Sequence, residues 1–393
     1  MPDGAWGRPW LVAVVAAAAV LSAQELIWRA KGFSSTVADD LDLWALARES
    51  VYDGGERSVV LLGASRMQLG FDTETFRRAC PGYPVVQLSI DGRHPLASLR
   101  DLAGDPEFRG IVICELLEEA LLPASHDQQQ DYVDYYHRQW TLEKRLGRQL
   151  RTLLQERLVI LNHQLNPRFI IKGLFGRWPK PPFLVTHADR SRSADYDKVS
   201  ASDLAKFANK WRTGRSREAN LDGVLTDEQW RQAVGEVGAW ARQIRARGGR
   251  VVLLRFPSSG EVYQIEKAHS PRPRFWDVLA GEPGIDAVHF EDVAAMRSLQ
   301  CPEESHLDYH DAQRCTLALV EELARRGVLQ PAAPLGYLWR QTGELSYLAA
   351  MVKLLDAAEP TGRADALGRD LADGPVAMGM LREAAVRKVR LPK

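Results

Sequence analysis

Short apolar runs recur along the chain at intervals that predict a parallel β-sheet. The runs cover residues 59–62, 85–90, 111–116, 251–255 and 286–290. A continuous apolar run bounded by turn residues is typical of a strand that is buried on both faces. Because helical patterns separate these runs, we predict a flavodoxin-like three-layer α/β/α sandwich with about five parallel strands.

The helical patterns have recognisable ends. We expect helices over residues 39–51, 72–79, 96–102, 226–247 and 312–326. Asp72 or Thr73 caps the second of these, and Thr226 caps the fourth. Gln229 follows Thr226 at the spacing of a capping box, and Gly248 and Gly249 end that helix.

The N-terminus, residues 1–31, carries an uncharged apolar run from Trp10 to Ala23. Three interpretations fit: a secretory signal cleaved after Ala23, an uncleaved signal anchor, and a buried core helix. We favour the anchor because the charged residues Arg29 and Lys31 follow the apolar stretch and no linker separates it from the rest of the chain. Trp10 and Trp28 also suit the membrane interface. The first two interpretations place the body outside the cytoplasm.

The pattern divides the rest of the chain into an α/β domain, residues 32–329, and a C-terminal helical appendage, residues 330–393. No strand alternation is evident over residues 126–220, where a helix is expected over 131–151. We interpret this stretch as a helical insertion that covers the carboxyl edge of the sheet, since long insertions are usually functional.

Composition excludes several classes of protein. The 393 residues carry 51 basic and 51 acidic side chains, and 45% are hydrophobic. This balance does not indicate disorder or a nucleic-acid surface. The four cysteines lack metal-ligand spacing, and we predict no metal and no cofactor. Cys301 and Cys315 are candidates for a disulfide in an oxidising compartment.

Candidate chemistry begins where the first strand ends, at Gly63-Ala64-Ser65. Open α/β sheets bind their ligands at the carboxyl ends of strands, so the Ser65 hydroxyl is well placed. Far along the chain, Glu303 precedes His306 by three residues, just before the last helix. A carboxylate at this spacing can hold the imidazole ring, whose other nitrogen then accepts the serine proton. Glu304 and Asp308 are alternative acids.

These motifs resemble the SGNH (GDSL-like) hydrolase superfamily, and most closely the membrane-anchored SGNH-like proteins of bacterial polysaccharide O-acetylation and teichoic-acid D-alanylation. The resemblance covers residues 59–326 without the insertion. It implies that Ser65 is the nucleophile, His306 the general base and Glu303 the orienting acid in place of the usual aspartate. Gly92 stands where the second block's glycine donates to the oxyanion together with the Ser65 N–H.

The sequence departs from the family pattern in the third block. Cys114-Glu115-Leu116-Leu117-Glu118 stands where an asparagine is expected to donate to the oxyanion, and it contains no asparagine. The loss of one such donor typically costs about 2.7–4 kcal/mol of transition-state stabilisation. Arg66 and Arg255 are candidates to substitute for it or to bind an anionic part of the substrate. The alternative is that each pairs with a protein carboxylate, Glu115 or Glu261.

The resemblance implies a membrane-tethered serine esterase or O-acyltransferase that acts on a cell-envelope polysaccharide. The acyl group is expected to be acetyl and to come from an MBOAT-type membrane partner. The chain would be a single-pass protein of the inner membrane with its main domain in the periplasm or outside the cell. One alternative is a catalytically weak or inactive SGNH-like scaffold that binds glycan or the MBOAT-type partner. Another is a soluble esterase released from a cleaved signal.

Overall fold

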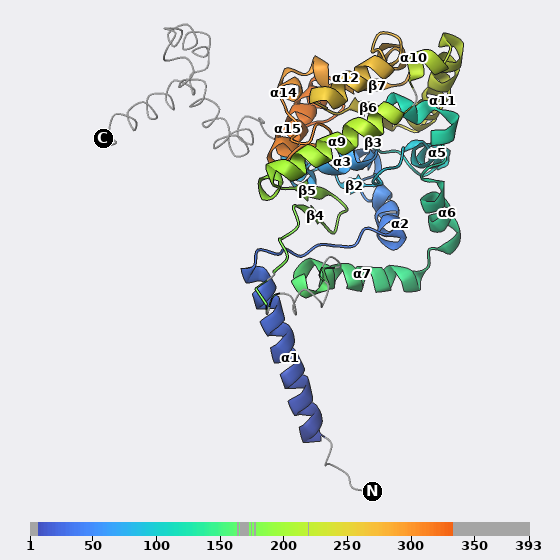
Figure 1. The fold of residues 1–393 in the computed structure, drawn as a ribbon. Helices are drawn as coiled ribbons and strands as arrows, with labels where there is room; N and C mark the ends of the chain where they lie inside the picture. The colour runs from blue at the N-terminus through green and yellow to red at the C-terminus, as the bar shows by residue number, and fades with distance from the viewer. Residues whose placement is uncertain are drawn as a thin grey trace, which may run out of the picture. The chain divides into compact units, whose positions relative to one another are not determined.

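The computed structural model describes residues 7–162, 165, 173, 175–176, 178–218 and 220–332. A five-stranded parallel sheet lies at its centre, in the order β2-β1-β3-β6-β7 (Figure 1). The strands are β1 (Val59–Leu62), β2 (Val85–Gln87), β3 (Ile111–Glu115), β6 (Arg250–Arg255) and β7 (Asp286–His289). When the strands of this sheet alone are numbered along the chain, their order is 2-1-3-4-5, which is the order of the flavodoxin fold. The predicted three-layer α/β/α class is therefore confirmed. The C-terminal appendage lies outside the described residues, except for residues 330–332.

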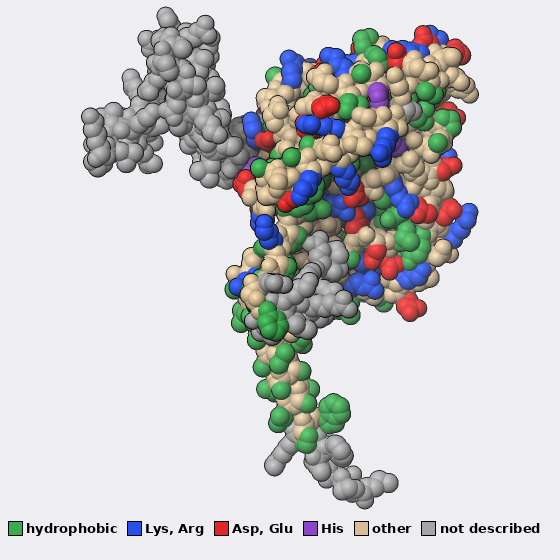
Figure 2. Space-filling model, in the orientation of Figure 1, with side chains coloured by type: hydrophobic (Ala, Val, Ile, Leu, Met, Phe, Trp, Pro, Cys, Tyr) green, Lys and Arg blue, Asp and Glu red, His purple; other side chains and the backbone are tan. Residues whose placement is uncertain are grey.

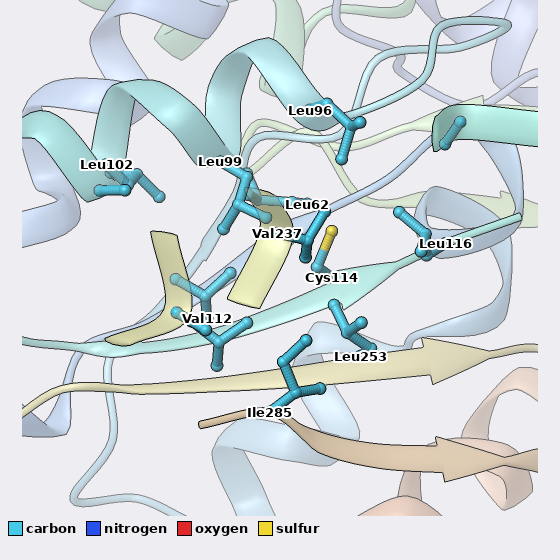
Figure 3. Close-up of a cluster of buried hydrophobic side chains, with 14 of the residues drawn as sticks. Leu62, Leu96, Leu99, Leu102, Val112, Cys114, Leu116, Val237, Leu253 and Ile285 are labelled. Atoms are coloured by element: carbon cyan, nitrogen blue, oxygen red, sulfur yellow. The ribbon is translucent and has the colours of Figure 1, made fainter. Parts of the chain in front are cut away.

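Helices bury both faces of the sheet because each presents an apolar side to it. Side chains of α5 (Leu96–Gly104) and α11 (Asp227–Ala246) meet those of β1, β3 and β6 in one buried cluster (Figure 3). α15 (Tyr309–Arg325) packs against α3 (Ser65–Gly70) and α4 (Thr73–Ala79). Asp72 caps α4, and Thr226 with Gln229 forms the predicted capping box at the start of α11. The remaining helices in this part of the chain are α2 (Leu41–Glu49), α10 (Leu221–Val224), α12 (Gly260–His269), α13 (Trp276–Ala280) and α14 (Ala294–Arg297).

The insertion contains more structure than its sequence pattern indicates. A hairpin of two three-residue strands, β4 (Leu184–Thr186) and β5 (Arg192–Ala194), was not predicted. Strands this short cannot show an alternation, so the pattern carries no signal. The single helix expected over residues 131–151 is two helices, α6 (Gln130–Gln139) and α7 (Leu142–Arg157), because Thr141 caps a new start. α9 (Ala201–Arg217) follows and packs along α12.

The N-terminal helix α1 (Gly7–Ala30) exposes its apolar side chains almost throughout, in contrast to the mixed charges of the body (Figure 2). The span Pro9–Ala30 is long and apolar enough to cross a membrane, and none of its most apolar 18-residue window is buried within the structure. This is compatible with a single-pass anchor or a signal sequence. Trp28, which was expected at the membrane interface, is instead buried beside Phe33 and Val159.

All four cysteines are buried free thiols. The suggested disulfide between Cys301 and Cys315 is therefore not present. The Cys301 thiol instead donates a hydrogen bond to the Pro257 carbonyl oxygen at 3.4 Å. Cys315 lies fully buried on the apolar side of α15.

Candidate active site

Ser65 lies at the point where the sheet changes its winding direction. β1 has β2 on one side and β3 on the other, and ligands of doubly wound sheets bind at the carboxyl ends of such a pair. Between β1 and Ser65 the chain turns at Gly63, whose φ is +153°. A Cβ atom there would lie 2.7 Å from the Glu115 carboxylate and 2.8 Å from Met67, so only glycine fits this turn.

A line of hydrogen bonds joins the three residues that the sequence motifs single out. The Ser65 hydroxyl oxygen is 2.8 Å from His306 Nε2. On the other side of the ring, His306 Nδ1 is 2.6 Å from Glu303 Oε1. If Nδ1 carries the proton, it donates to the carboxylate, and Nε2 is left to accept from the serine. Glu303 and His306 are almost fully buried, and Ser65 is half-buried.

The two alternative acids are engaged elsewhere. Glu304 accepts hydrogen bonds from the Arg212 guanidinium, one of them at 2.8 Å. Asp308 is the N-cap of α15, where it accepts from the backbone N–H of His310. Glu303 is therefore the carboxylate that contacts His306.

The insertion adds two side chains that no motif indicated. The Tyr196 hydroxyl donates to Glu303 Oε1 at 3.1 Å, and that oxygen also accepts the backbone N–H of His306 at 2.7 Å. Burial and the adjacent Glu303 carboxylate raise the pKa of Tyr196, which keeps its proton available as a donor. Trp211 of α9 packs edge-on against the His306 ring, with centroids 4.9 Å apart. Both residues restrict how the imidazole and its acid can move.

Gly92 lies in the turn that follows β2, with a φ of +69°. The turn is tied to the start of the candidate site because the Ile90 N–H donates to the Gly63 carbonyl at 3.1 Å. The fully buried Gln129 side chain donates to the carbonyl oxygens of both Gly63 and Arg93, each at 3.1 Å. Gln129 thus clamps the two backbone segments that carry the expected oxyanion donors. It stands in a run of glutamines, where no sequence signal separates it from its neighbours.

Glu115 lies in the stretch, residues 114–118, where the resemblance predicts an asparagine. Its Oε2 accepts the backbone N–H of Ala64 at 2.8 Å, and the residue is only 3% exposed. The side chain therefore holds the turn before Ser65 as an acceptor, whereas an oxyanion requires a donor.

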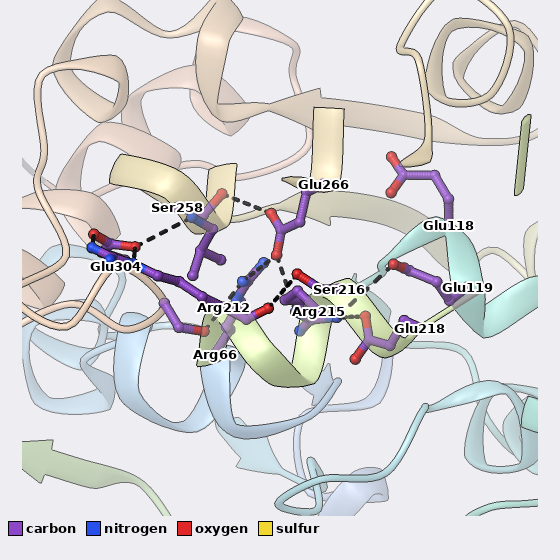
Figure 4. A network of polar contacts seen from close by, with 12 residues as sticks. Arg66, Glu118, Glu119, Arg212, Arg215, Ser216, Glu218, Ser258, Glu266 and Glu304 are labelled. Atoms are coloured by element: carbon purple, nitrogen blue, oxygen red, sulfur yellow. Dashed lines mark hydrogen bonds and ion pairs between the residues drawn. The ribbon is translucent and has the colours of Figure 1, made fainter. Parts of the chain in front are cut away.

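Arg66 and Arg255 meet at one buried carboxylate, Glu266 of α12. Figure 4 shows Glu266 with Arg66, Arg215 and Ser258 around it. Arg66 Nη2 is 2.5 Å from Glu266 Oε1, and Arg255 Nη2 is 3.0 Å from Oε2. Arg215, from α9 of the insertion, approaches Oε1 at 3.3 Å, and Ser258 donates to Oε2 at 2.7 Å. Burial alone would raise the pKa of Glu266, but the three guanidinium groups hold it well below its usual value.

Part of each arginine remains without a protein partner. Nε and Nη1 of Arg66 and Nη1 of Arg255 are buried and have no hydrogen-bond partner among the described residues. Arg66 Nη2 also reaches Ser305, the residue before His306, at 3.2 Å. The ion-pair cluster thus adjoins both the nucleophile and the loop that carries the base.

A further pocket lies away from Ser65, and the described residues contain no cluster of side chains that could bind a metal ion. A surface pocket of about 640 Å³ between α5 and α6 is lined by residues that include Asp101, Asp105 and His137, and Ser65 is not among them. Within the described residues, no group of three or more His, Cys, Asp or Glu side chains is placed to hold a metal ion.

Comparison with known proteins adds little to this geometry. No protein-family model matches the sequence, and no curated protein matches it. Among solved structures, the crystal structure of TesA is similar at a TM-score of 0.28 and 13% sequence identity, over 68% of this chain and 98% of that one. A similarity at this level carries no argument about activity.

Proposed function

We propose that this protein is a membrane-tethered serine esterase or O-acyltransferase of the SGNH type. The observation that carries the proposal is the continuous hydrogen-bonded line from Ser65 through His306 to Glu303, at 2.8 and 2.6 Å. Nucleophile, base and orienting acid are the three groups that acyl transfer through a serine requires.

The proposed reaction proceeds in two halves. The Ser65 oxygen attacks an acyl carbonyl carbon while its proton passes to His306 Nε2. The tetrahedral intermediate collapses as the leaving oxygen takes that proton, which gives an acyl-enzyme. Water or a sugar hydroxyl then gives its proton to His306 and takes the acyl group, and Ser65 is regenerated. The backbone N–H groups of Ser65 and Gly92 are the proposed oxyanion donors.

The proposed substrate class follows from the motif resemblance and from α1. A body tethered by an apolar helix suits an acceptor in the cell envelope, such as a polysaccharide, and an acyl donor, most simply acetyl, passed on by an MBOAT-type membrane partner.

A second function is favoured by one observation. The stretch that is expected to supply an oxyanion donor has no asparagine, and its Glu115 accepts a hydrogen bond, which supports an SGNH-like scaffold that binds glycan or its membrane partner with little turnover. The two functions differ in whether Ser65 is a reactive nucleophile.

Labelling of the purified full chain with a fluorophosphonate probe separates the two. We expect covalent labelling that Ser65→Ala and His306→Gln both abolish, because the serine attacks only when a base removes its proton. His310→Gln is the matched control, since His310 lies four residues further on, in α15, and labelling should persist. Absence of Ser65-dependent label on folded protein would leave the scaffold as the better description.

A further inference from the structure

The helix α7 buries a polar side and exposes an apolar side, which is the reverse of an ordinary surface helix. The residues that it buries are polar: Arg148, Thr152 and Gln155. Arg148 pairs with Asp40 at 2.8 Å and donates to the Ala38 carbonyl oxygen at 2.7 Å. A helix of a water-soluble protein normally turns its apolar side to the core and its polar side to solvent.

The side that α7 leaves open carries five leucines, Leu142, Leu146, Leu150, Leu153 and Leu154, which we call the leucine face. They are 67, 57, 59, 41 and 41% exposed. Their spacing of three or four residues places them in one stripe. Among the nineteen exposed large hydrophobic residues of the described chain, nine lie on α1 and these five on α7. A contiguous apolar surface of this kind marks a contact with a membrane or a partner.

The position of α7 relative to α1 favours the membrane. The short turn that follows α7, Val159–Leu161, is bound by Glu25 of α1, whose carboxylate accepts the N–H groups of Val159 and Ile160 at 3.0 Å each. Arg29 of α1 donates to the carbonyl oxygen of Arg157, the last residue of α7, at 2.6 Å.

Glu25 and Arg29 are about 6 Å apart along the helix axis. The end of α7 is thus fixed where the long apolar stretch of α1 ends, as Figure 1 shows. If that stretch enters a bilayer, α7 lies at the level of the lipid headgroups.

The charges of α7 suit an anionic surface. With the buried Arg148 left out, the helix has four basic and two acidic residues, a formal charge of +2. Arg145 and Arg151 flank the leucine face and are 48 and 57% exposed, although each also lies 3.4 Å from a carboxylate, that of Glu49 and that of Asp40. Basic side chains beside a stripe of leucines are typical of helices that lie in the plane of a membrane interface.

We propose that α7 is an interfacial membrane helix, with its leucine face inserted among the lipid acyl chains and its arginines on anionic headgroups. The proposal rests on the anchoring of α1 that is part of the proposed function. Two membrane contacts, one along α1 and one along α7, fix the orientation of the body toward the bilayer. A single tether would leave that orientation free.

The test places a fluorophore on the leucine face of the full chain. Leu150→Cys carries an environment-sensitive NBD label, and the control is Val224→Cys on α10, which is 61% exposed and is not on α7. The native thiols do not compete, because they are buried and burial raises the pKa of all four. Both proteins are reconstituted into vesicles of equal parts phosphatidylcholine and phosphatidylglycerol, with and without a nitroxide-labelled lipid.

We expect the label at residue 150 to shift its emission to the blue and to lose about half or more of its intensity to the nitroxide lipid, because the apolar face of an interfacial helix lies about 5–10 Å into the headgroup–acyl boundary. The label at residue 224 should remain bright. Weaker quenching in vesicles of phosphatidylcholine alone than in the mixed vesicles would support the contact with anionic lipid. Equal quenching in the two would overturn the proposed contact between the arginines and anionic headgroups.

Two other results overturn the proposal. If the protein floats with the vesicles but both labels are equally unquenched, α1 is anchored and α7 is not in the interface. If the label at 150 is shielded from aqueous iodide yet unquenched by the nitroxide lipid, a protein surface covers the leucine face. A chain that fails to float with the vesicles contradicts the anchoring by α1 itself, which distinguishes that failure from the other two.

Discussion

The loops of the central sheet and the helical insertion contribute differently to the candidate site. The sheet loops carry the groups proposed to react, Ser65 after β1 and His306 with Glu303 before α15. The described part of the insertion places Tyr196 against Glu303 and Trp211 against His306. Reacting groups and supporting groups thus come from separate parts of the chain. Short motifs indicate the first kind, and only the folded structure reveals the second.

The largest expected effect is on the sheet side of this comparison, at Glu303. We expect Glu303→Gln to lower kcat by about 10⁴-fold, as loss of the orienting carboxylate does in serine proteases that use a Ser-His-acid triad. An amide no longer stabilises the charged ring or fixes Nδ1 as the protonated nitrogen. Hydrolysis of a small acetyl ester by the purified full chain measures the effect.

Glu304→Gln is the matched control for that measurement. It makes the same change at the next residue, whose partners are Arg212 and the backbone N–H of Val262. We expect its kcat to stay near that of the unchanged protein. If both variants lose equal activity, the loss reflects damage to the loop and the role assigned to Glu303 is wrong.

The second largest effect is expected on stability, at Glu266, where the sheet domain and the insertion contact each other. Glu266 lies between Arg66 and Arg255 from the sheet side and Arg215 from the insertion. We expect Glu266→Gln to lower the free energy of unfolding by about 3–5 kcal/mol, because it leaves buried arginine charges uncompensated. Urea unfolding of the detergent-solubilised chain measures the loss. Glu261→Gln, which removes a mostly exposed carboxylate 3.2 Å from Arg212, should cost at most about 1 kcal/mol.

Acidification gives a second measure of the same carboxylate. The pKa of Glu266 is lowered in the folded protein by the three arginines, whereas an unfolded glutamate titrates near about 4.3. Its stabilising contribution is therefore complete above that pH and is lost as the pH falls toward the folded value. As the pH is lowered from 6, the free energy of unfolding should fall more steeply for the unchanged protein than for Glu266→Gln. Parallel curves would mean that the arginines do not hold this carboxylate ionised.

The sheet was the most predictable part of the molecule. Its three central strands, β1, β3 and β6, are buried almost throughout, so each appears as an apolar run, and the parallel three-layer fold followed from the spacers between the runs. Ser65 and His306 were also selected from sequence, although 241 positions separate them, because each follows or precedes a predicted element within a short motif.

The supporting residues could not be found in this way. Tyr196, Trp211 and Gln129 act through contacts that exist only after the insertion folds back on the sheet domain. Likewise, the pattern of α7 predicts a helix but not which face it turns inward. That choice depends on Asp40 and Ala38, more than a hundred residues away, which bind Arg148. Tertiary contacts of this kind leave no local periodicity.

The smallest expected effect is on the insertion side, at Tyr196. Tyr196→Phe keeps the ring, which packs on Phe183, and removes only the hydroxyl that donates to Glu303. A hydrogen bond to a charged group contributes about 1.5–3 kcal/mol, so we expect kcat to fall by about 10- to 150-fold. KM should not change, because Tyr196 acts on the acid and not on the substrate. Tyr309→Phe, which removes a hydroxyl at the start of α15, should leave both constants unchanged. A rise in KM at constant kcat would instead make Tyr196 a substrate contact. The insertion would then bind substrate as well as support the groups that the sheet supplies.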